Sequence, residues 1–482
     1  MKKKILLGLL LITILCVLGI FRTPILTYFN GMYTIWKDQS TYPVLQAKIV
    51  PLGKVNENAI EFSPDGSSIL IGEQMTDEAG NIFLFSNFKL VNAQGEFIAN
   101  LGPAKWGYFI PDGILLVAPY RQDIDANMTM LTTPWKFFYY AQDGTFIKET
   151  AGAMGVYPQL IFNHDQSKFV TFHGYEGGQT AEVERIYSID GTELASFSLM
   201  CNEEINQIQF SADGKKLSMT SYFGVYQFDT AGNLLQEVVV PQINIPIPRI
   251  FDSLGNSATE DGILFSPDLS QFVISDEFDQ AEIYTMEGNL IKSLESVVAI
   301  TYTPDGRYLI GRKFGSHYSD EIYVYDTEND FSARLITVYD DLYELEVDST
   351  TGRLLIYGCT DQITWESGTF CYGGNASLWN MDGTLIEEMN DLHEVYNAII
   401  VPNSELVFTS GCVAIHELSR IFPTFNCMRE SGRMHNLKDQ TVYSLDGTFS
   451  EIIASPDGNG IVTINHDGEA ELLFLEKNSL QE

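Results

Sequence analysis

Short apolar runs recur along the chain beyond about residue 45, separated by polar turns. The runs are rich in β-branched and aromatic residues, as at residues 168–172 (Lys-Phe-Val-Thr-Phe) and 321–325 (Glu-Ile-Tyr-Val-Tyr). Runs of this length and composition predict β-strands. No long stretch in this region has the period of an amphipathic helix. The pattern therefore predicts an all-β domain.

The first kind of turn carries Pro, Asp and Gly. Pro presets the first central dihedral angle, Asp hydrogen-bonds back to the backbone, and Gly accepts a positive φ. Weaker copies occur at residues 348–352 and 401–404, and a strong copy occurs at 455–458. Successive turn aspartates lie 47, 53, 48, 55 and 37 residues apart: Asp65, Asp112, Asp165, Asp213, Asp268 and Asp305. Such a period is typical of one propeller blade.

A second turn, marked by glycine, follows each of these turns at a regular distance. The second-turn glycines are Gly95, Gly144, Gly191, Gly232, Gly288, Gly383 and Gly447. Two independent markers with one period predict four-stranded units that pack radially as a β-propeller. The markers favour eight blades, and seven or nine also fit the uneven C-terminal spacing. We expect residues 48–52 and 471–475 to share a blade and close the ring, which removes exposed sheet edges.

The turn phrase Phe-Ser-Pro-Asp-Gly at residues 62–66, with related phrases near residues 210, 265, 302 and 455, resembles the repeats of WD-repeat-like and TolB-type bacterial β-propellers. The likeness covers nearly all of residues 47–475. The chain departs from true WD repeats, because no Gly-His opens the units and Trp379-Asn380 is the nearest match to Trp-Asp. The resemblance implies a propeller that works by binding.

The N-terminus combines three lysines, at residues 2–4, with an unbroken apolar run from Ile5 to Phe21. Bulky residues follow where a signal peptidase needs small ones, which favours an uncleaved signal anchor over residues 1–22; a cleaved signal peptide is the alternative. The lysines place the rest of the chain on the extracytoplasmic side. We therefore expect a cell-membrane protein with one transmembrane helix, a juxtamembrane linker at 23–45, a propeller at 46–476 and a tail at 477–482.

The charge of the chain excludes one class of partner. Its 28 Lys and Arg residues face 64 Asp and Glu residues, which gives a net charge of −36. A nucleic acid would be repelled rather than release counterions. A solvated acidic surface that keeps the protein soluble explains the charge. The alternative is that the charge recruits cations or a basic partner. A protein or glycan ligand remains compatible with the composition.

Catalytic motifs do not stand out in the sequence. It has no Gly-x-Ser-x-Gly elbow, His-Glu-x-x-His helix, Walker loop or EF-hand loop, so we predict no catalytic or cofactor-binding residue and a binding module rather than an enzyme. First strands line the channel of a propeller, where Glu61, Glu344 and Glu346 could offer oxygen ligands to Ca²⁺. The same residues could instead face water. A metal-dependent lactonase-like or phosphodiesterase-like hydrolase using the channel is the alternative function.

Five cysteines follow the apolar run, and four of them flank predicted strands. We predict disulfides Cys359–Cys371 and Cys412–Cys427, which close loops of 12 and 15 residues, and an unpaired Cys201. Reduced, buried thiols or cross-pairing between the two loops are the alternatives. Residues 412–440 also carry Arg420, Arg429 and Arg433, which we expect to pair with acidic neighbours rather than with an anionic ligand.

Overall fold

The computed structural model describes most of the chain between residues 32 and 475. The described ranges are 32–34, 37–38, 41–45, 47–76, 82–119, 135–152, 159–172, 184–197, 205–221, 224–239, 263–275, 280–314, 319–348, 351–365, 368–417, 425–447 and 449–475. The predicted anchor at residues 1–22, the tail at 477–482, Cys201 and Arg420 lie outside these ranges. No helix within them has both the length and the apolar character needed to cross a bilayer.

Seven separate four-stranded sheets follow one another along the described chain, each an antiparallel meander. The first four are β5 Trp106–Ile110, β6 Gly113–Pro119, β7 Trp135–Tyr140, β8 Phe146–Ala151; β9 Gln159–Phe162, β10 Lys168–Phe172, β11 Glu184–Ser188, β12 Glu193–Phe197; β13 Ile205–Phe210, β14 Lys216–Ser221, β15 Gly224–Asp229, β16 Leu234–Val239; and β17 Ile263–Phe265, β18 Gln271–Ser275, β19 Ala281–Thr285, β20 Leu290–Leu294. The other three are β21 Val298–Tyr302, β22 Tyr308–Phe314, β23 Asp320–Asp326, β24 Ser332–Tyr339; β25 Asp341–Val347, β26 Arg353–Trp365, β27 Gly368–Asn380, β28 Leu385–Met389; and β29 Glu394–Val401, β30 Leu406–Glu417, β31 Phe425–Asn436, β32 Thr441–Asp446.

One further sheet joins the two ends of the domain. It has seven strands in the order β33-β34-β35-β1-β2-β3-β4. Its strands are β33 Glu451–Ala454, β34 Gly460–Ile464, β35 Glu469–Phe474, β1 Lys48–Phe62, β2 Ser68–Thr76, β3 Ile82–Asn92 and β4 Phe97–Ala104. The first part of β1 pairs with β35, with Lys48 opposite Phe474, and the second part pairs with β2, with Ile60 opposite Ile71. The predicted ring closure is therefore confirmed.

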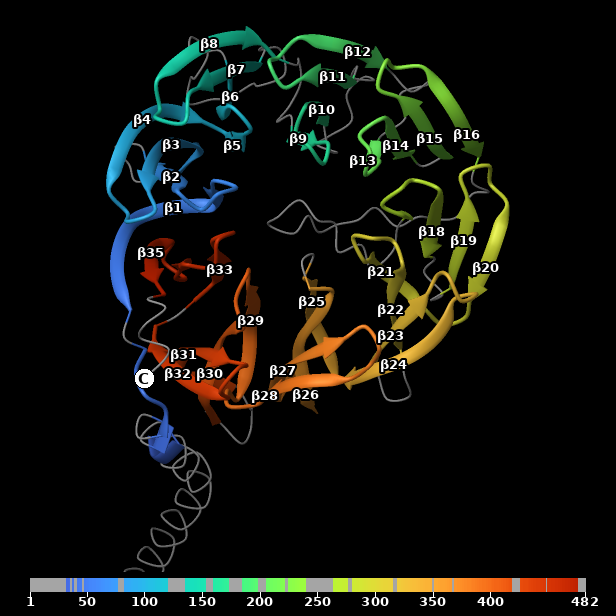
Figure 1. Ribbon diagram of the computed structural model, residues 1–482. Helices are drawn as coiled ribbons and strands as arrows, with labels where there is room; N and C mark the ends of the chain where they lie inside the picture. The colour runs from blue at the N-terminus through green and yellow to red at the C-terminus, as the bar shows by residue number, and fades with distance from the viewer. Residues whose placement is uncertain are drawn as a thin grey trace, which may run out of the picture.

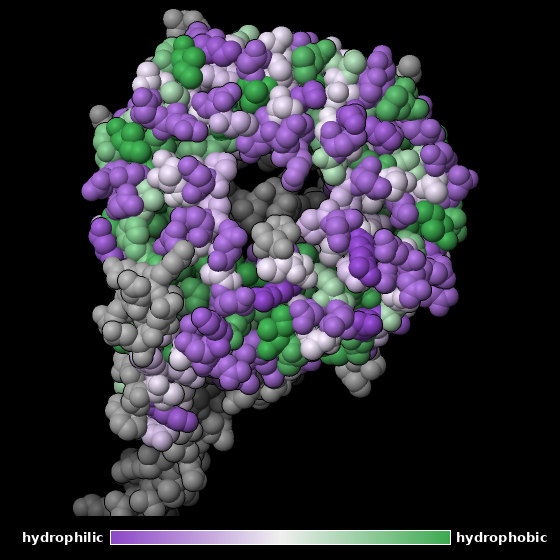
Figure 2. All heavy atoms as spheres, in the orientation of Figure 1, coloured by the Kyte–Doolittle hydropathy of each residue, from purple (hydrophilic) through white to green (hydrophobic). Residues whose placement is uncertain are grey.

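The sheets stand radially around a central opening (Figure 1). First strands such as β5, β13 and β25 lie near the centre, and fourth strands such as β8, β16 and β24 form the circumference. Figure 2 shows the hollow at the centre of a largely hydrophilic face. This all-β arrangement is that of a β-propeller, as the sequence predicts.

The predicted turns form as their chemistry requires. In the first of them, the Asp65 carboxylate accepts hydrogen bonds from the Ser63 hydroxyl (2.7 Å) and the Ser67 amide (3.0 Å), and these bonds lower the pKa of Asp65 to about 2. Gly66 closes the turn with φ +71°. The same serine or threonine bond to the turn aspartate recurs later in the chain, at Ser211–Asp213, Ser266–Asp268, Thr303–Asp305 and Ser455–Asp457.

Apolar layers between neighbouring sheets hold the ring together. One layer joins Val170 and Ile186 of the β9–β12 sheet to Ile208 and Leu217 of the β13–β16 sheet. All four side chains are buried, and similar layers occur between other neighbouring sheets. Each sheet therefore buries its faces against its neighbours, which explains why the units are stable only as a stack.

Candidate functional site

Two of the carboxylates offered as cation ligands link neighbouring sheets. Glu61 on β1 accepts a hydrogen bond from the amide of Phe109 on β5 (3.2 Å), and Glu346 on β25 accepts one from the amide of Ile400 on β29 (3.3 Å). Burial raises the pKa of Glu61 to about 8 and that of Glu346 to about 7, while the amide bonds lower it. The two residues thus play the same structural part at two places in the ring.

The third candidate, Glu344, accepts a hydrogen bond from the hydroxyl of Tyr357 on the adjacent strand β26. It shares β25 with Glu346, whereas Glu61 belongs to the sheet that closes the ring. Among the described residues, no three His, Cys, Asp or Glu side chains are grouped in a way that could hold a metal ion. The convergence of these three carboxylates that the sequence suggested is therefore not observed.

A different site is built on two consecutive sheets that carry the predicted disulfides. The hairpins β26–β27 and β30–β31 have strands of 12 or 13 residues. Cys359 is bonded to Cys371, and Cys412 to Cys427, each pair with a Cα–Cα distance of 5.6 Å. Both disulfides are therefore present as the sequence predicts, and each fastens one long hairpin.

Each fastened hairpin packs directly against the start of the first strand of its sheet. Asp341 lies opposite Cys359, and Glu394 lies opposite Cys412. A glycine precedes each of these cysteines, and a Cβ atom there would lie 2.3 Å from the Asp341 carbonyl oxygen at Gly358 and 1.9 Å from the Glu394 carbonyl oxygen at Gly411. Only glycine permits this approach, so each glycine sets how closely its hairpin packs against the acidic residue, one position before the disulfide-bonded cysteine.

A β-bulge follows each acidic residue and reorients a tyrosine. The register of β25 shifts between Leu342 and Glu344, which makes Tyr343 the extra residue, and that of β29 shifts between Val395 and Asn397, which makes Tyr396 the extra residue. A bulge changes the direction of the side chain it carries. The two sheets thus present equivalent tyrosines.

The two tyrosines meet at one carboxylate. The Tyr343 hydroxyl donates to Oε1 of Glu394 (2.9 Å), and Tyr396 hydrogen-bonds to the same carboxylate. We call Tyr343, Glu394 and Tyr396 the tyrosine–glutamate cluster. Burial raises the pKa of Glu394, and the two hydroxyl bonds lower it. Burial, followed by the carboxylates of Glu394 and Glu430, raises the pKa of Tyr396.

The cluster combines aromatic faces with negative charge. Tyr343 keeps 39% of its surface exposed, so the cluster is accessible from solvent. Glu430, whose charge acts on Tyr396, lies 3.3 Å from the His466 ring nitrogen. A carboxylate binds an ammonium or guanidinium group by charge-assisted hydrogen bonds, and a phenol ring attracts the same cation through its face. The arrangement can therefore hold the cationic end of a ligand.

Sequence reasoning missed this cluster, although a signal for it exists. Asp341-Leu-Tyr343 and Glu394-Val-Tyr396 share one pattern, and each tyrosine precedes a Gly-Cys pair at the same distance, 16 residues before the cysteine. A comparison of the two cysteine-bearing units with each other would have found it. Which tyrosine reaches which carboxylate depends on the bulges, and the sequence pattern does not reveal these.

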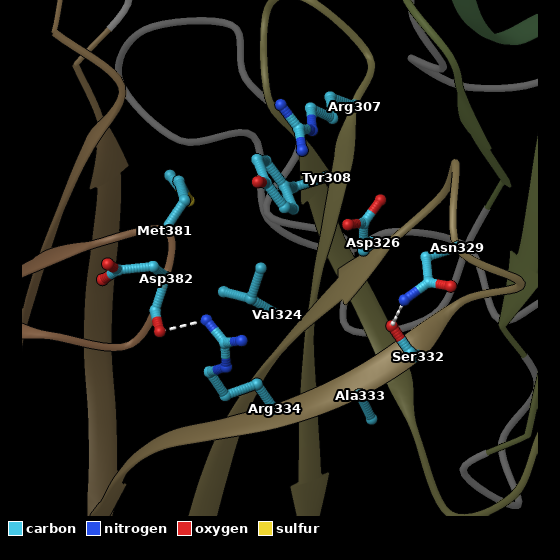
Figure 3. Close-up of a pocket in the computed structure, with 10 residues that line it drawn as sticks. All are labelled: Arg307, Tyr308, Val324, Asp326, Asn329, Ser332, Ala333, Arg334, Met381 and Asp382. Carbon is cyan, nitrogen blue, oxygen red and sulfur yellow. Dashed lines mark hydrogen bonds between the residues drawn. The ribbon is translucent and has the colours of Figure 1, made fainter.

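A pocket of about 270 Å³ lies between the β21–β24 and β25–β28 sheets (Figure 3). The Arg334 guanidinium donates to the Asp382 carbonyl oxygen across the two sheets, and the Arg307 guanidinium lies 5.1 Å from the centre of the Tyr308 ring. Its ten lining residues are Arg307, Tyr308, Val324, Asp326, Asn329, Ser332, Ala333, Arg334, Met381 and Asp382. The wall mixes both signs of charge, so the pocket favours neither anions nor cations.

Comparisons with known proteins give structural similarities without a family. No protein family model matches the sequence, and no curated protein matches it. The chain is similar to the C-terminal WD40 domain of Sif2 (10% identity, TM-score 0.43, covering 90% of this chain and 99% of that one). It is also similar to the Dos1 propeller (10%, 0.43, 90% and 95%) and to Sqt1 from Chaetomium thermophilum (13%, 0.42, 76% and 94%). The β-propeller assignment itself follows from the strand order of this chain.

Proposed function

We propose that the protein is a membrane-anchored, extracytoplasmic β-propeller that acts as a binding module. The observation that carries the proposal is the tyrosine–glutamate cluster, which lies on strands paired with two disulfide-fastened hairpins. Fixing the backbone in advance lowers the entropic cost of binding, which is what a recognition site requires. The ligand that best fits the cluster is a protein partner that offers a lysine or arginine side chain.

The charge of the chain supports a basic partner. A net charge of −36 accelerates the encounter with a positively charged surface and repels acidic ones. The carboxylate of Glu394 then supplies a defined contact, and the rings of Tyr343 and Tyr396 supply apolar area. A neutral glycan would use the rings without the charge, so the two ligand classes differ in their response to removal of the charge.

The proposed location rests on the N-terminal sequence and agrees with the disulfides. Lysines at residues 2–4 before the apolar run Ile5–Phe21 favour a signal anchor with the propeller outside the cytoplasm. Disulfides form and persist in oxidising compartments, and two are present in the propeller. Intact-mass measurement on membrane-extracted protein should find residues 1–22 retained; a mature N-terminus beyond residue 22 would refute the anchor.

We also propose a nine-bladed ring, in place of the eight blades that the turn markers favoured. Counted over the described strands, seven sheets are separate and β1 completes two further four-stranded meanders, one with β33–β35 and one with β2–β4. The turn phrases near residues 62, 210, 265, 302 and 455 support the TolB-type resemblance as a hypothesis about origin. Averaged images of the purified ring by electron microscopy would test the blade number.

The binding proposal is tested with two charge-matched variants of the full chain in detergent. Glu394→Gln removes the central charge but keeps an acceptor for the tyrosine hydroxyls, and Glu237→Gln removes an exposed charge on β16. With a lysine-rich peptide as the probe, we expect Glu394→Gln to weaken binding about tenfold or more and Glu237→Gln to leave it unchanged. Equal losses in both variants would reduce the interaction to general electrostatics. Tight binding of a neutral oligosaccharide that survives Glu394→Gln would favour a glycan ligand instead.

The metal-dependent hydrolase hypothesis is tested by measuring the metal content of the protein. A stoichiometric divalent ion in the purified full chain, lost when Glu344 and Glu346 are changed to Gln, would support it. The hydrogen-bond partners of Glu61, Glu344 and Glu346 favour the structural roles described above.

A further inference from the structure

The segment before β1 follows the outer edge of the β29–β32 sheet. β32 is the last strand of that sheet, and its edge is occupied by this segment. The Ser444 amide donates to the Pro43 carbonyl oxygen and the Leu45 amide donates to the Ser444 carbonyl oxygen, both at 2.8 Å. Val44 and Ser444 form a parallel bridge. Residues 43–45 therefore pair with the edge of the sheet through one parallel bridge.

An apolar contact accompanies this pairing. Leu45 is 7% exposed and packs in the same layer as Phe408, Met434 and Leu445. Burying a leucine side chain removes apolar surface from water, so the contact holds the segment against the sheet. A linker that only connects two parts of a chain would leave such a side chain in water.

The most specific contact is a buried ion network. Arg433 on β31 is fully buried, and its guanidinium pairs with Asp38 from the N-terminal segment and with Asp391 from the β28–β29 loop, the latter at 3.1 Å. Asp38 is itself only 7% exposed and lies 3.7 Å from the Arg429 guanidinium. The Tyr42 ring lies 5.0 Å from the Arg433 guanidinium.

The network makes detachment of the segment costly. Removing one carboxylate from a buried ion network leaves the arginine charges less well compensated where water is scarce, which is destabilising. If the segment left β32, Arg433 and Arg429 would both lose Asp38, and the β32 edge would lose its backbone partners. Release of the segment from β32 therefore requires the backbone hydrogen bonds, the apolar contact of Leu45 and the ion pairs of Asp38 to be lost together.

We propose that Asp38 and residues 41–45 form a charge-locked strut that attaches the N-terminal side of the described chain to the edge of the β29–β32 sheet. The link between the strut and the membrane rests on the proposed anchor at residues 1–22. The strut joins the ring at its circumference, not on the channel axis. A pull from the proposed anchor would then act on the ring at this edge rather than directly at β1.

Hydrogen exchange of the full chain in lipid nanodiscs tests the strut. Asp38→Asn removes the locking charge, and Asp467→Asn makes the same charge change in the exposed β34–β35 turn. In Asp38→Asn we expect the amides of Leu45 and Ser444 to exchange at least tenfold faster, with no change in Asp467→Asn. Unchanged exchange in Asp38→Asn would overturn the lock.

A second variant keeps the test decisive if Asp38→Asn folds poorly. Leu45→Ser leaves the buried charges intact and removes only the apolar contact, so it should also speed exchange at the Ser444 amide; slow exchange there would overturn the strut. The anchor is judged separately by the intact mass of the same sample. If residues 1–22 are absent while the two amides stay protected, the strut is supported and its link to the membrane is refuted.

Discussion

Glu61→Gln should stabilise the propeller at neutral and alkaline pH. Burial raises the pKa of Glu61 to about 8 from the ordinary value of 4.5, so between these pH values the folded chain holds a proton that the unfolded chain has released. Stability must then fall as pH rises through this window. Glutamine has nearly the same shape, cannot ionise, and still offers an oxygen to the Phe109 amide. The variant removes the pH-dependent cost and keeps the contact.

The size of the effect follows from the two pKa values. One unit corresponds to about 1.4 kcal/mol, so a shift from 4.5 to about 8 sets an upper bound of about 5 kcal/mol at pH 8 and above. At pH 7 the bound is about 3.4 kcal/mol. Glu61 keeps part of its surface in water, which lowers the cost of ionisation. We therefore expect about 1–3 kcal/mol at pH 8 and almost nothing at pH 4.5.

Differential scanning calorimetry at pH 4.5, 6, 7 and 8.5 measures this difference. The melting temperature of Glu61→Gln should exceed that of the unmodified chain by an amount that grows with pH and levels off above pH 8. Glu237→Gln, an exposed carboxylate on β16, is the control for the loss of one negative charge. If the difference in melting temperature between Glu61→Gln and the unmodified chain is the same at every pH, Glu61 is not held protonated in the folded chain.

Three further outcomes are expected. Replacing Cys412 and Cys427 together by serine should lower the free energy of unfolding by about 3 kcal/mol, because the loop between them has 15 residues; an unchanged urea midpoint would contradict this. Gly411→Ala should cost several kcal/mol, since its Cβ atom would lie 1.9 Å from a β29 carbonyl oxygen, whereas Gly460→Ala meets only ordinary contacts and should melt close to the unmodified chain. Glu346→Gln should gain stability with pH as Glu61→Gln does, but level off near pH 7, and calorimetry that shows no gain above pH 5 would argue against it.

Local chemistry made much of the fold predictable. The turn at Asp65 needs only a neighbouring serine, proline and glycine, all within five residues, so the local sequence is enough to predict it. The disulfides could also be predicted, because the turn phrases mark the ends of the strands that carry the cysteines. Ring closure followed from two unpaired apolar segments at opposite ends of the domain.

What the sequence did not reveal depends on register or on distance along the chain. The bulges at Tyr343 and Tyr396 each insert one residue, and a period of two cannot show where such an insertion falls. The partners Asp38 and Arg433 are 395 residues apart, and nothing local marks them as a pair. The pairing of Arg429 and Arg433 with acidic neighbours was expected, but the neighbour from the N-terminal segment was not.

The shared strand β1 determines how the ring responds to a force applied from its N-terminal side. Backbone hydrogen bonds in antiparallel sheets run across the strands, so a pull along β1 loads its bonds to β35 and β2 in shear, all at once, rather than one after another. The load also passes to both ends of the folded chain, because β35 lies between β34 and β1. A force transmitted past the strut to β1 would thus reach the first and last units of the ring together.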